Sequence, residues 1–136
     1  MNTVKKIGGM LAAAAIAGLL ATPAIAAKKD AETRLAERLE GYVAGEPVDC
    51  IDTHRVRSST IYENTAIVFD AGSTLYVNRP ENGARSLDRS DIMVTRNYTT
   101  QLCDIDTVQM HDTSGFWTGS VFLGKFVPYK RAPEKG

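Results

Sequence analysis

Two cysteines and two histidines are the residue types in this sequence from which a zinc site could be built. Cys50 precedes His54 by four positions, and Cys103 precedes His111 by eight. If the first pair lies on an extended strand, its side chains stand about 13 Å apart, whereas ligands of one zinc ion converge within a few ångströms. The close Cys-x2-Cys and His-x3-His spacings are missing. We therefore predict no metal site and expect both histidines at the surface or in hydrogen bonds.

The same cysteines have a second chemistry, oxidation to a disulfide. Cys50 and Cys103 are the two cysteines of the chain. In an exported protein such a pair is read as a disulfide, because compartments outside the cytosol oxidise thiols. The bond would close a long loop and contribute on the order of 4 kcal/mol to stability. We predict a structural disulfide and no cofactor.

Three aspartates in the last third of the chain could gather around calcium. Asp104, Asp106 and Asp112 are close in sequence, and alternate residues of a strand share a face. An EF-hand loop counted from Asp104 would need glycine at its sixth position and glutamate at its twelfth, where Gln109 and Gly115 stand. Carboxylates of turns and of the solvent-facing surface are therefore the favoured interpretation.

Catalysis has little support in the residue pattern. Paired carboxylates, Asp88 with Asp91 or Asp104 with Asp106, could flank a groove as in glycoside hydrolases. The chain has no Gly-x-Ser-x-Gly elbow, no glycine-rich phosphate loop and no cysteine expected to be free as a thiolate. We predict no catalytic residue, and a small carboxylate-dependent hydrolase stays open as an alternative.

The first 26 residues have the composition of a signal peptide. Lys5 and Lys6 precede an almost wholly apolar run over 7–21, and residues 23–26 end in the small-x-small pattern of a signal-peptidase site. The run is short and interrupted by glycines, which argues against a membrane-spanning helix. We expect cleavage after Ala26, a periplasmic or secreted product, and no stable membrane anchor after cleavage.

Residues 27–136 would then form a single domain of 110 residues, a usual size for one hydrophobic core. Without Lys5 and Lys6, 14 of the 16 basic residues stay against 16 acidic ones, so the formal charge is −2. This balance does not favour nucleic acid or an anionic membrane as partner. The expected partner is an unidentified protein or a small ligand of the cell envelope.

Residues 28–42 carry the helical pattern of the sequence. Leu35, Leu39 and Tyr42 recur at helical spacing, Asp30 can cap the start, and Gly41 or Gly45 can end the helix. Short β-type runs separated by turn residues follow over 48–129, and a mobile polar tail is expected over 130–136. The pattern predicts a mainly β fold, a small antiparallel barrel or sandwich of about six to eight strands preceded by one amphipathic helix.

The clearest hairpin joins residues 65–69 to 74–78 through an Asp-Ala-Gly-Ser turn. The aromatic-rich last third is interpreted as core, with residues 116–126 forming one long bent strand. Period-two alternation places Phe116, Phe122 and Phe126 on one face of that strand, and Trp117 on the other.

Several short motifs resemble a family of exported bacterial proteins of unknown function. They are Gly45-Glu46-Pro47-Val48, Cys50-Ile51, Tyr76-Val77-Asn78-Arg79-Pro80, Leu102-Cys103-x-x-Asp106 and Gly124-x-Phe126-Val127-Pro128-Tyr129. The resemblance implies no activity. It implies a second disulfide in other members at the positions of Ala84 and Val121, so that Cys50 and Cys103 would be the retained pair.

Taken together, the residues predict a small exported protein with one disulfide that binds a partner without catalysis. An inhibitor of a cell-wall hydrolase such as lysozyme is an alternative, based on the size of the protein, its expected export and its fold class.

Overall fold

The computed structural model describes residues 29–134, and the expected signal peptide 1–26 with its cleavage site lies outside them. The described chain contains one α-helix, two short 3-10 helices and ten strands. In chain order these are α1 (Ala31–Arg38), β1 (Tyr42–Ala44), β2 (Cys50–Asp52), η1 (Thr53–Arg55), β3 (Ser58–Tyr62), β4 (Ala66–Asp70), β5 (Thr74–Asn78), η2 (Ala84–Ser86), β6 (Ile92–Val94), β7 (Gln101–Cys103), β8 (Thr107–His111), β9 (Trp117–Phe122) and β10 (Phe126–Arg131).

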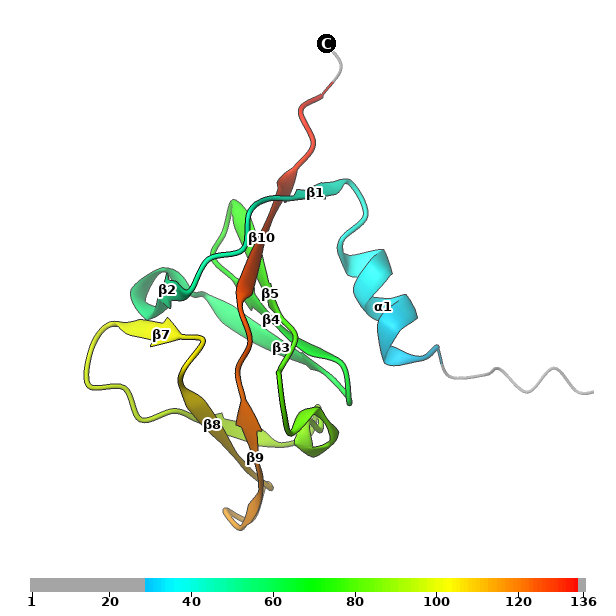
Figure 1. Ribbon diagram of the computed structural model, residues 1–136. Coiled ribbons are helices and arrows are strands. Elements are labelled where there is room, and N and C mark those ends of the chain that lie inside the picture. Colours follow the sequence, from blue (N-terminus) through cyan, green and yellow to red (C-terminus); the bar gives the residue numbers. More distant parts are fainter. Residues whose placement is uncertain (1–28, 135–136) are drawn as a thin grey trace, which may run out of the picture.

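The strands form three antiparallel sheets (Figure 1). The largest has the order β1-β10-β5-β4-β3, a second has the order β6-β8-β9, and β2 pairs with β7. The mainly β, sandwich-like class predicted from the sequence is therefore confirmed. The closed barrel is not confirmed, because β3 and β6 each have a neighbour on one side only within the described residues. The strand count is not confirmed either, since the described residues form ten strands where six to eight were expected.

The helix is shorter than the 28–42 expected. The carboxylate of Asp30 accepts a hydrogen bond from the Thr33 N–H at 2.8 Å, which caps the first turn. Gly41 adopts a left-handed backbone with φ of 81°, and Tyr42 then begins β1 instead of continuing the helix. Leu35 is 1% exposed, so the helix lies by its apolar stripe against the domain. No helix within 29–134 is long and apolar enough to cross a membrane.

The five-stranded sheet is buried on both faces, which divides the core into two layers. On one face, Leu35 of α1 packs in a cluster with Tyr62, Val68, Leu75 and Val77. On the other face, the sheet packs against β2, β7, β8 and β9. That larger cluster contains Ile51, Ile61, Ile67, Phe69, Leu87, Leu102, Val108, Met110, Val121, Leu123 and Phe126. The sheet is therefore the middle layer between α1 and the β6-β8-β9 sheet (Figure 1).

The predicted hairpin is confirmed as β4 and β5, which pair antiparallel from Ile67 opposite Asn78 to Asp70 opposite Leu75. The Asp70 carboxylate accepts a hydrogen bond from the Gly72 N–H at 2.8 Å, and Gly72 has a φ of 85°. Aspartate and glycine thus supply the turn chemistry that the sequence indicated.

The expectation of one strand over 116–126 is wrong. β9 ends at Phe122 and β10 begins at Phe126 in another sheet. The chain bends at Gly124, where a Cβ atom would lie 2.4 Å from the Arg79 carbonyl oxygen, so no other residue fits without a shift. β10 also extends to Arg131 and pairs with β1, which places Lys130 and Arg131 in the sheet and not in the expected tail.

Candidate functional site

The outer face of the β6-β8-β9 sheet carries a row of exposed apolar side chains, which we call the aromatic strip. It consists of Ile92 on β6 and of Trp117 and Phe122 on β9, with exposed fractions of 53%, 61% and 51%. Phe116, which is 72% exposed, lies next to the strip in the β8–β9 turn. Exposed large apolar side chains that share one face of a sheet are a feature of partner-binding surfaces. The strip corrects the interpretation of this region as core.

A β-bulge explains why the strip could not be recognised in the sequence. Trp117 and Phe122 are five positions apart, and strict alternation would place them on opposite faces. The register shifts between Met110 and His111, so that Trp117 pairs with His111 while Phe122 pairs with Thr107. The extra residue in β9 therefore brings both aromatic side chains to the outer face.

His111 lies in the middle of the strip. Its strand neighbours are Ile92 on β6 and Trp117 on β9, and cross-strand partners share a face. Its Nδ1 atom is buried and has no hydrogen-bond partner in the described part of the chain. His54 lies instead in η1, is exposed, and uses its main-chain N–H to bond Asp52. The structure thus places the two histidines on different elements.

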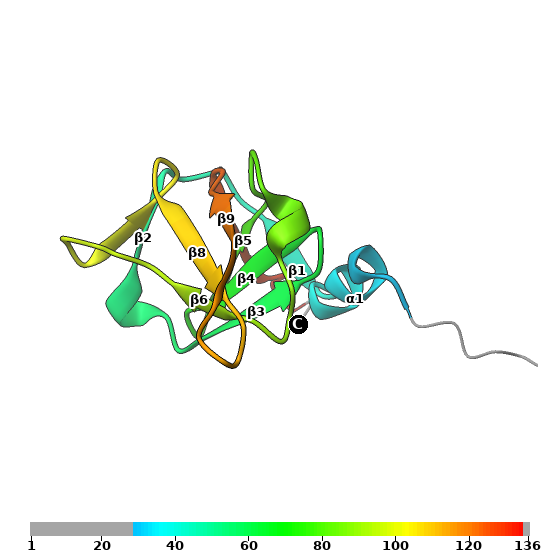
Figure 2. The same ribbon diagram turned by 90° about the horizontal axis from the view of Figure 1, so that it is seen from below.

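A second candidate surface is the groove between the unpaired edges of β3 and β6, which we call the β3–β6 groove. It consists of two adjoining hollows of about 510 and 240 Å³ that share Ser59 of β3 and Met93 of β6. Figure 2 shows the two strands with no strand between them. The smaller hollow reaches core residues, since Ile51, Phe69 and Leu102 line its floor.

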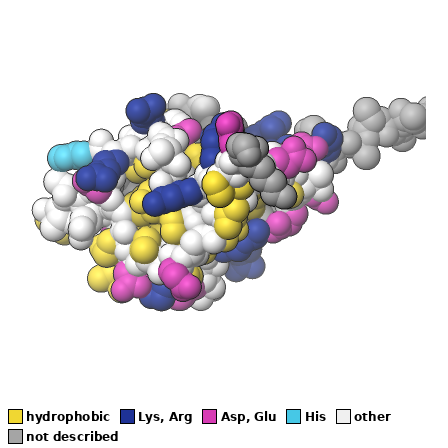
Figure 3. Space-filling view, turned by 90° about the horizontal axis from the view of Figure 1, so that it is seen from above, with side chains coloured by type: hydrophobic (Ala, Val, Ile, Leu, Met, Phe, Trp, Pro, Cys, Tyr) yellow, Lys and Arg dark blue, Asp and Glu magenta, His cyan; other side chains and the backbone are white. Residues whose placement is uncertain are grey.

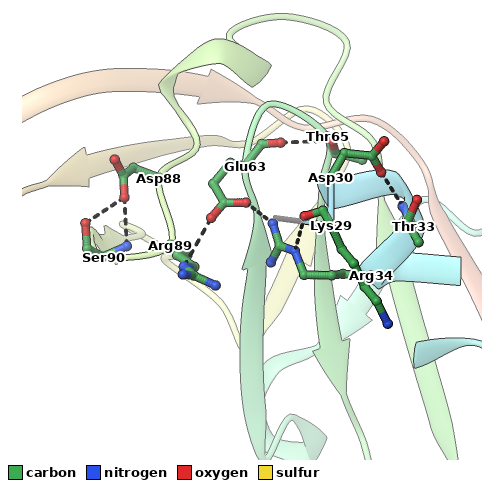
Figure 4. A network of polar contacts seen from close by, with 9 residues as sticks. All are labelled: Lys29, Asp30, Thr33, Arg34, Glu63, Thr65, Asp88, Arg89 and Ser90. Carbon is green, nitrogen blue, oxygen red and sulfur yellow. Dashed lines mark hydrogen bonds and ion pairs between the residues drawn. The ribbon is translucent and has the colours of Figure 1, made fainter. Parts of the chain in front are cut away.

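A polar network closes the end of the β3–β6 groove nearest α1 (Figure 4). Glu63, in the turn after β3, accepts a hydrogen bond from Arg34 of α1 and forms an ion pair with Arg89 at 3.2 Å. The hydrogen bond from Arg34 lowers the pKa of the Glu63 carboxyl, so this group stays ionised at neutral pH. A polar hollow of about 580 Å³ continues on the far side of Arg34 and Arg89.

The cysteines form the predicted disulfide. Cys50 of β2 and Cys103 of β7 face each other in the strand pair and are bonded through their sulfur atoms. They are therefore unavailable as zinc ligands or nucleophiles.

The aspartates of the calcium hypothesis have separate partners. Asp104 accepts a hydrogen bond from Lys125 at 2.7 Å, and Asp106 accepts one from the Cys103 N–H at 2.7 Å. Asp112 accepts bonds from the main-chain N–H groups of Ser114 and Phe116 and so shapes the β8–β9 turn. Hydrogen bonds with Asp104 and with Asp49 raise the pKa of Lys125. No group of three or more candidate metal ligands occurs among residues 29–134.

The carboxylates of the hydrolase hypothesis also have partners within the chain. Asp88 accepts bonds from the hydroxyl and N–H of Ser90, and these bonds lower its pKa. Asp91 accepts a bond from the Thr118 hydroxyl at 2.6 Å. These contacts give both aspartates structural roles at the ends of the loop before β6.

Charges are mixed across the surface, as the near-neutral composition suggests. On the face shown in Figure 3, side chains of both signs lie among hydrophobic ones. Many of the charges pair with each other, as in Arg79 with Glu32 at 2.5 Å and Lys125 with Asp49 at 2.6 Å.

Comparison of the chain with protein-family models, with curated proteins and with solved structures finds no match.

Proposed function

We propose that the protein is an exported, non-catalytic binding module whose partner is another protein of the periplasm or the extracellular space. The aromatic strip carries this proposal. Its side chains lie on the outside of a sheet, where a flat protein surface can cover them, and not in an enclosed cavity of the kind that holds small molecules. Tryptophan and other aromatic residues contribute strongly to protein interfaces because they bury a large area at low entropic cost.

The proposed localisation outside the cytosol rests on the signal-peptide pattern of residues 1–26 and is supported by the disulfide, which oxidising compartments favour. Intact mass of the protein recovered from the periplasm tests it. The expected species begins at Ala27 and lacks two hydrogens because of the Cys50–Cys103 bond. Recovery of the uncleaved chain with two free thiols would contradict export.

Site-specific crosslinking in the native compartment tests the partner. A photoreactive residue in place of Thr107, which pairs with Phe122 on the strip, should give an adduct with a second protein. The same residue in place of Glu37, exposed on α1, serves as the control and should give none. The double variant W117S/F122S should abolish the Thr107 adduct while folding normally, since both side chains are more than half exposed. An adduct that persists in this variant would exclude the strip, and an adduct with the same chain would indicate self-association.

Inhibition of a cell-wall hydrolase is a second candidate, favoured by the shape of the β8–β9 turn. The Asp112 carboxylate bonds the N–H groups of Ser114 at 2.9 Å and Phe116 at 3.0 Å, and the Asp112 N–H bonds the Phe116 carbonyl. The turn is thus held in one conformation with Phe116 exposed beside Trp117, and a rigid protrusion of this kind loses little entropy on entering a cleft. Assays with a panel of lysozymes test this function, and unchanged activity throughout would exclude it for that class.

The resemblance to exported proteins of unknown function is kept as a proposal about relationship alone. It is supported by contacts between its motifs, since Asn78 of one motif bonds Gly124 of another, and the Gly45 N–H bonds the Pro128 carbonyl at 2.7 Å.

A further inference from the structure

We propose that the β3–β6 groove is a strand-addition site for an extended segment of a partner protein, with apolar residues at alternate positions and acidic residues beside them. The inference is independent of the aromatic strip. It rests on main-chain groups, a hollow and charges that meet in one place.

The first observation is the direction of the main chain in β3. The Ala71 N–H bonds the Thr74 carbonyl across the β4–β5 turn. Because neighbouring residues of a strand direct their main-chain groups to opposite sides, Phe69 and Ile67 face β5, whereas Val68 and Ala66 face β3. The partners of Val68 and Ala66 on β3 are Thr60 and Tyr62. Ser59 and Ile61 therefore direct their N–H and C=O groups away from the sheet, into the groove.

The main-chain directions in β6 follow from those in β8 and β9. The Phe122 N–H bonds the Asn82 carbonyl, and the Phe122 carbonyl accepts from Glu81, so Phe122 faces away from β8. Val121 and its partner Val108 then face each other, and the β8 residues opposite Ile92 and Val94 face β6. Met93 lies between those two residues and directs its main-chain groups into the groove. No main-chain hydrogen bond of Ser59, Ile61 or Met93 toward the groove occurs within residues 29–134.

Unpaired donors and acceptors on opposite walls, those of Ser59 and Ile61 on β3 and of Met93 on β6, are what an extended chain can satisfy, and this is the basis of strand addition. A strand bound along β3 would also lie beside Met93 and would join the two sheets across their open side. Because neighbouring strands lie 4.7–4.9 Å apart, this ligand must present its own main chain, and a folded helix would not fit the requirement.

The second observation is the hollow beneath these edges. Its floor consists of core side chains, with Met93 and Val56 partly buried at its sides. Alternate side chains of an added strand point to the same face, so a ligand bonded to Ser59 would direct an apolar side chain into this hollow.

The third observation is the charge of the groove, which selects the occupant. The two hollows are lined by Arg34, Arg57 and Arg89 and by the carboxylate of Asp91. Arg34 and Arg89 share the single carboxylate of Glu63, so that end of the groove keeps an excess of positive charge. Arg57 is exposed and has no ion pair with another described residue. An acidic residue near each end of the ligand would complement these guanidinium groups.

A synthetic peptide of alternating valine and threonine with an acidic residue at each end is the probe. We expect it to slow amide hydrogen exchange at Ser59, Ile61 and Met93 by about tenfold or more, with little change at Thr60, which already bonds β4. A peptide with lysine at each end should bind about tenfold more weakly, and one with N-methylated valines should not bind. Protection confined to β9, or no saturable binding by the acidic peptide, would overturn the proposal.

A matched pair of variants at Ser59 tests the main-chain contact. Ser59→Pro removes an N–H that no strand of the sheet uses, and proline is tolerated at such edge positions, whereas Ser59→Ala keeps the N–H. We expect S59P to lose peptide binding at least tenfold and S59A to retain it. If S59P does not fold, the amide hydrogen exchange of the natural sequence with the acidic peptide tests strand addition instead. Sedimentation adds a further outcome, since a dimer that competes with the peptide would show that a second copy occupies the groove.

The variant W117S/F122S separates this inference from the proposed function. It should bind the probe peptide as the natural sequence does. Loss of its crosslinked partner with retained peptide binding would support both sites, whereas equal peptide binding by S59P and S59A would overturn strand addition alone.

Discussion

The side chain of Asn78 and the main chain of Gly124 exchange two hydrogen bonds in the centre of the protein. The Asn78 Nδ2 donates to the Gly124 carbonyl at 2.7 Å, and its Oδ1 accepts from the Gly124 N–H at 2.9 Å. Asn78 is fully buried at the end of β5, and Gly124 lies where the chain passes from β9 to β10. One amide therefore satisfies both polar groups of a buried bend.

Replacement of Asn78 by alanine should be among the more destabilising single changes in this protein. It leaves the N–H and C=O of Gly124 buried without partners, at about 1–3 kcal/mol for each group. Urea denaturation should show a loss of about 2–4 kcal/mol. Asn82→Ala is the matched control, because that side chain is exposed, and should change stability by less than about 0.5 kcal/mol. Equal effects of the two variants would contradict the role of the Asn78 amide.

Loss of the disulfide should lower stability without changing the fold. The Cys50–Cys103 bond spans 53 positions of sequence, for which the chain-entropy relation gives about 4 kcal/mol. The free energy of unfolding should fall by about this amount in the variant C50S/C103S and in the natural sequence under reductant, so both should unfold at a lower denaturant concentration. Denaturation of the variant with and without reductant is the control and should give one midpoint.

Stability should fall on acidification, in part through Glu63. The Arg34 hydrogen bond lowers the pKa of Glu63 in the folded protein below its ordinary value of 4.5. Protonation is therefore less favourable in the folded state, so the stabilisation is complete above about pH 4.5 and is lost as the pH falls below it. The variant E63Q should lose up to about 1 kcal/mol at pH 7 and show a weaker dependence on pH below 4.5.

Urea midpoints between about pH 3 and pH 7 measure this dependence. Glu46→Gln is the control, since Glu46 is exposed and forms no ion pair within the described chain. An E63Q curve parallel to that of the natural sequence would show that Arg34 and Arg89 do not stabilise the Glu63 carboxylate.

The double variant A84C/V121C tests the family resemblance. The segment after Pro80 lies along β9, with Asn82 bridged to Phe122 and a Cβ at Gly83 only 3.1 Å from the Val121 Cα. The resemblance predicts that cysteines at 84 and 121 form a second disulfide, seen as four blocked thiols in the intact mass. The single variant A84C should retain one reactive thiol. Two reactive thiols in the folded double variant would count against the resemblance.

Features that depend on neighbouring residues were predictable from the sequence. The Asp30 cap, the buried Leu35 stripe and the β4–β5 turn follow from residue types within a few positions of each other. The disulfide also followed, because two cysteines allow a single pairing.

Features that depend on register between distant strands were not predictable. A one-residue bulge moves Trp117 to the face of Phe122, and no residue type at these positions indicates a bulge. The β3–β6 groove arises because two short strands have no second neighbour, which is a property of the whole topology. Two motifs of the family resemblance are in contact through the hydrogen bond between Asn78 and Gly124. The groove residues Ser59, Ile61 and Met93 lie outside these motifs, so the resemblance did not indicate the groove.

The bond between Cys50 and Cys103 makes residues 50–103 a closed covalent ring, and both walls of the β3–β6 groove belong to it. A protease that cuts once in the long connection between β5 and β6 would open the ring without releasing either piece. The product would weigh one water molecule more and would still carry β3 and β6 on the same molecule. Both walls of the β3–β6 groove would thus stay on one covalent molecule after a cut in this connection.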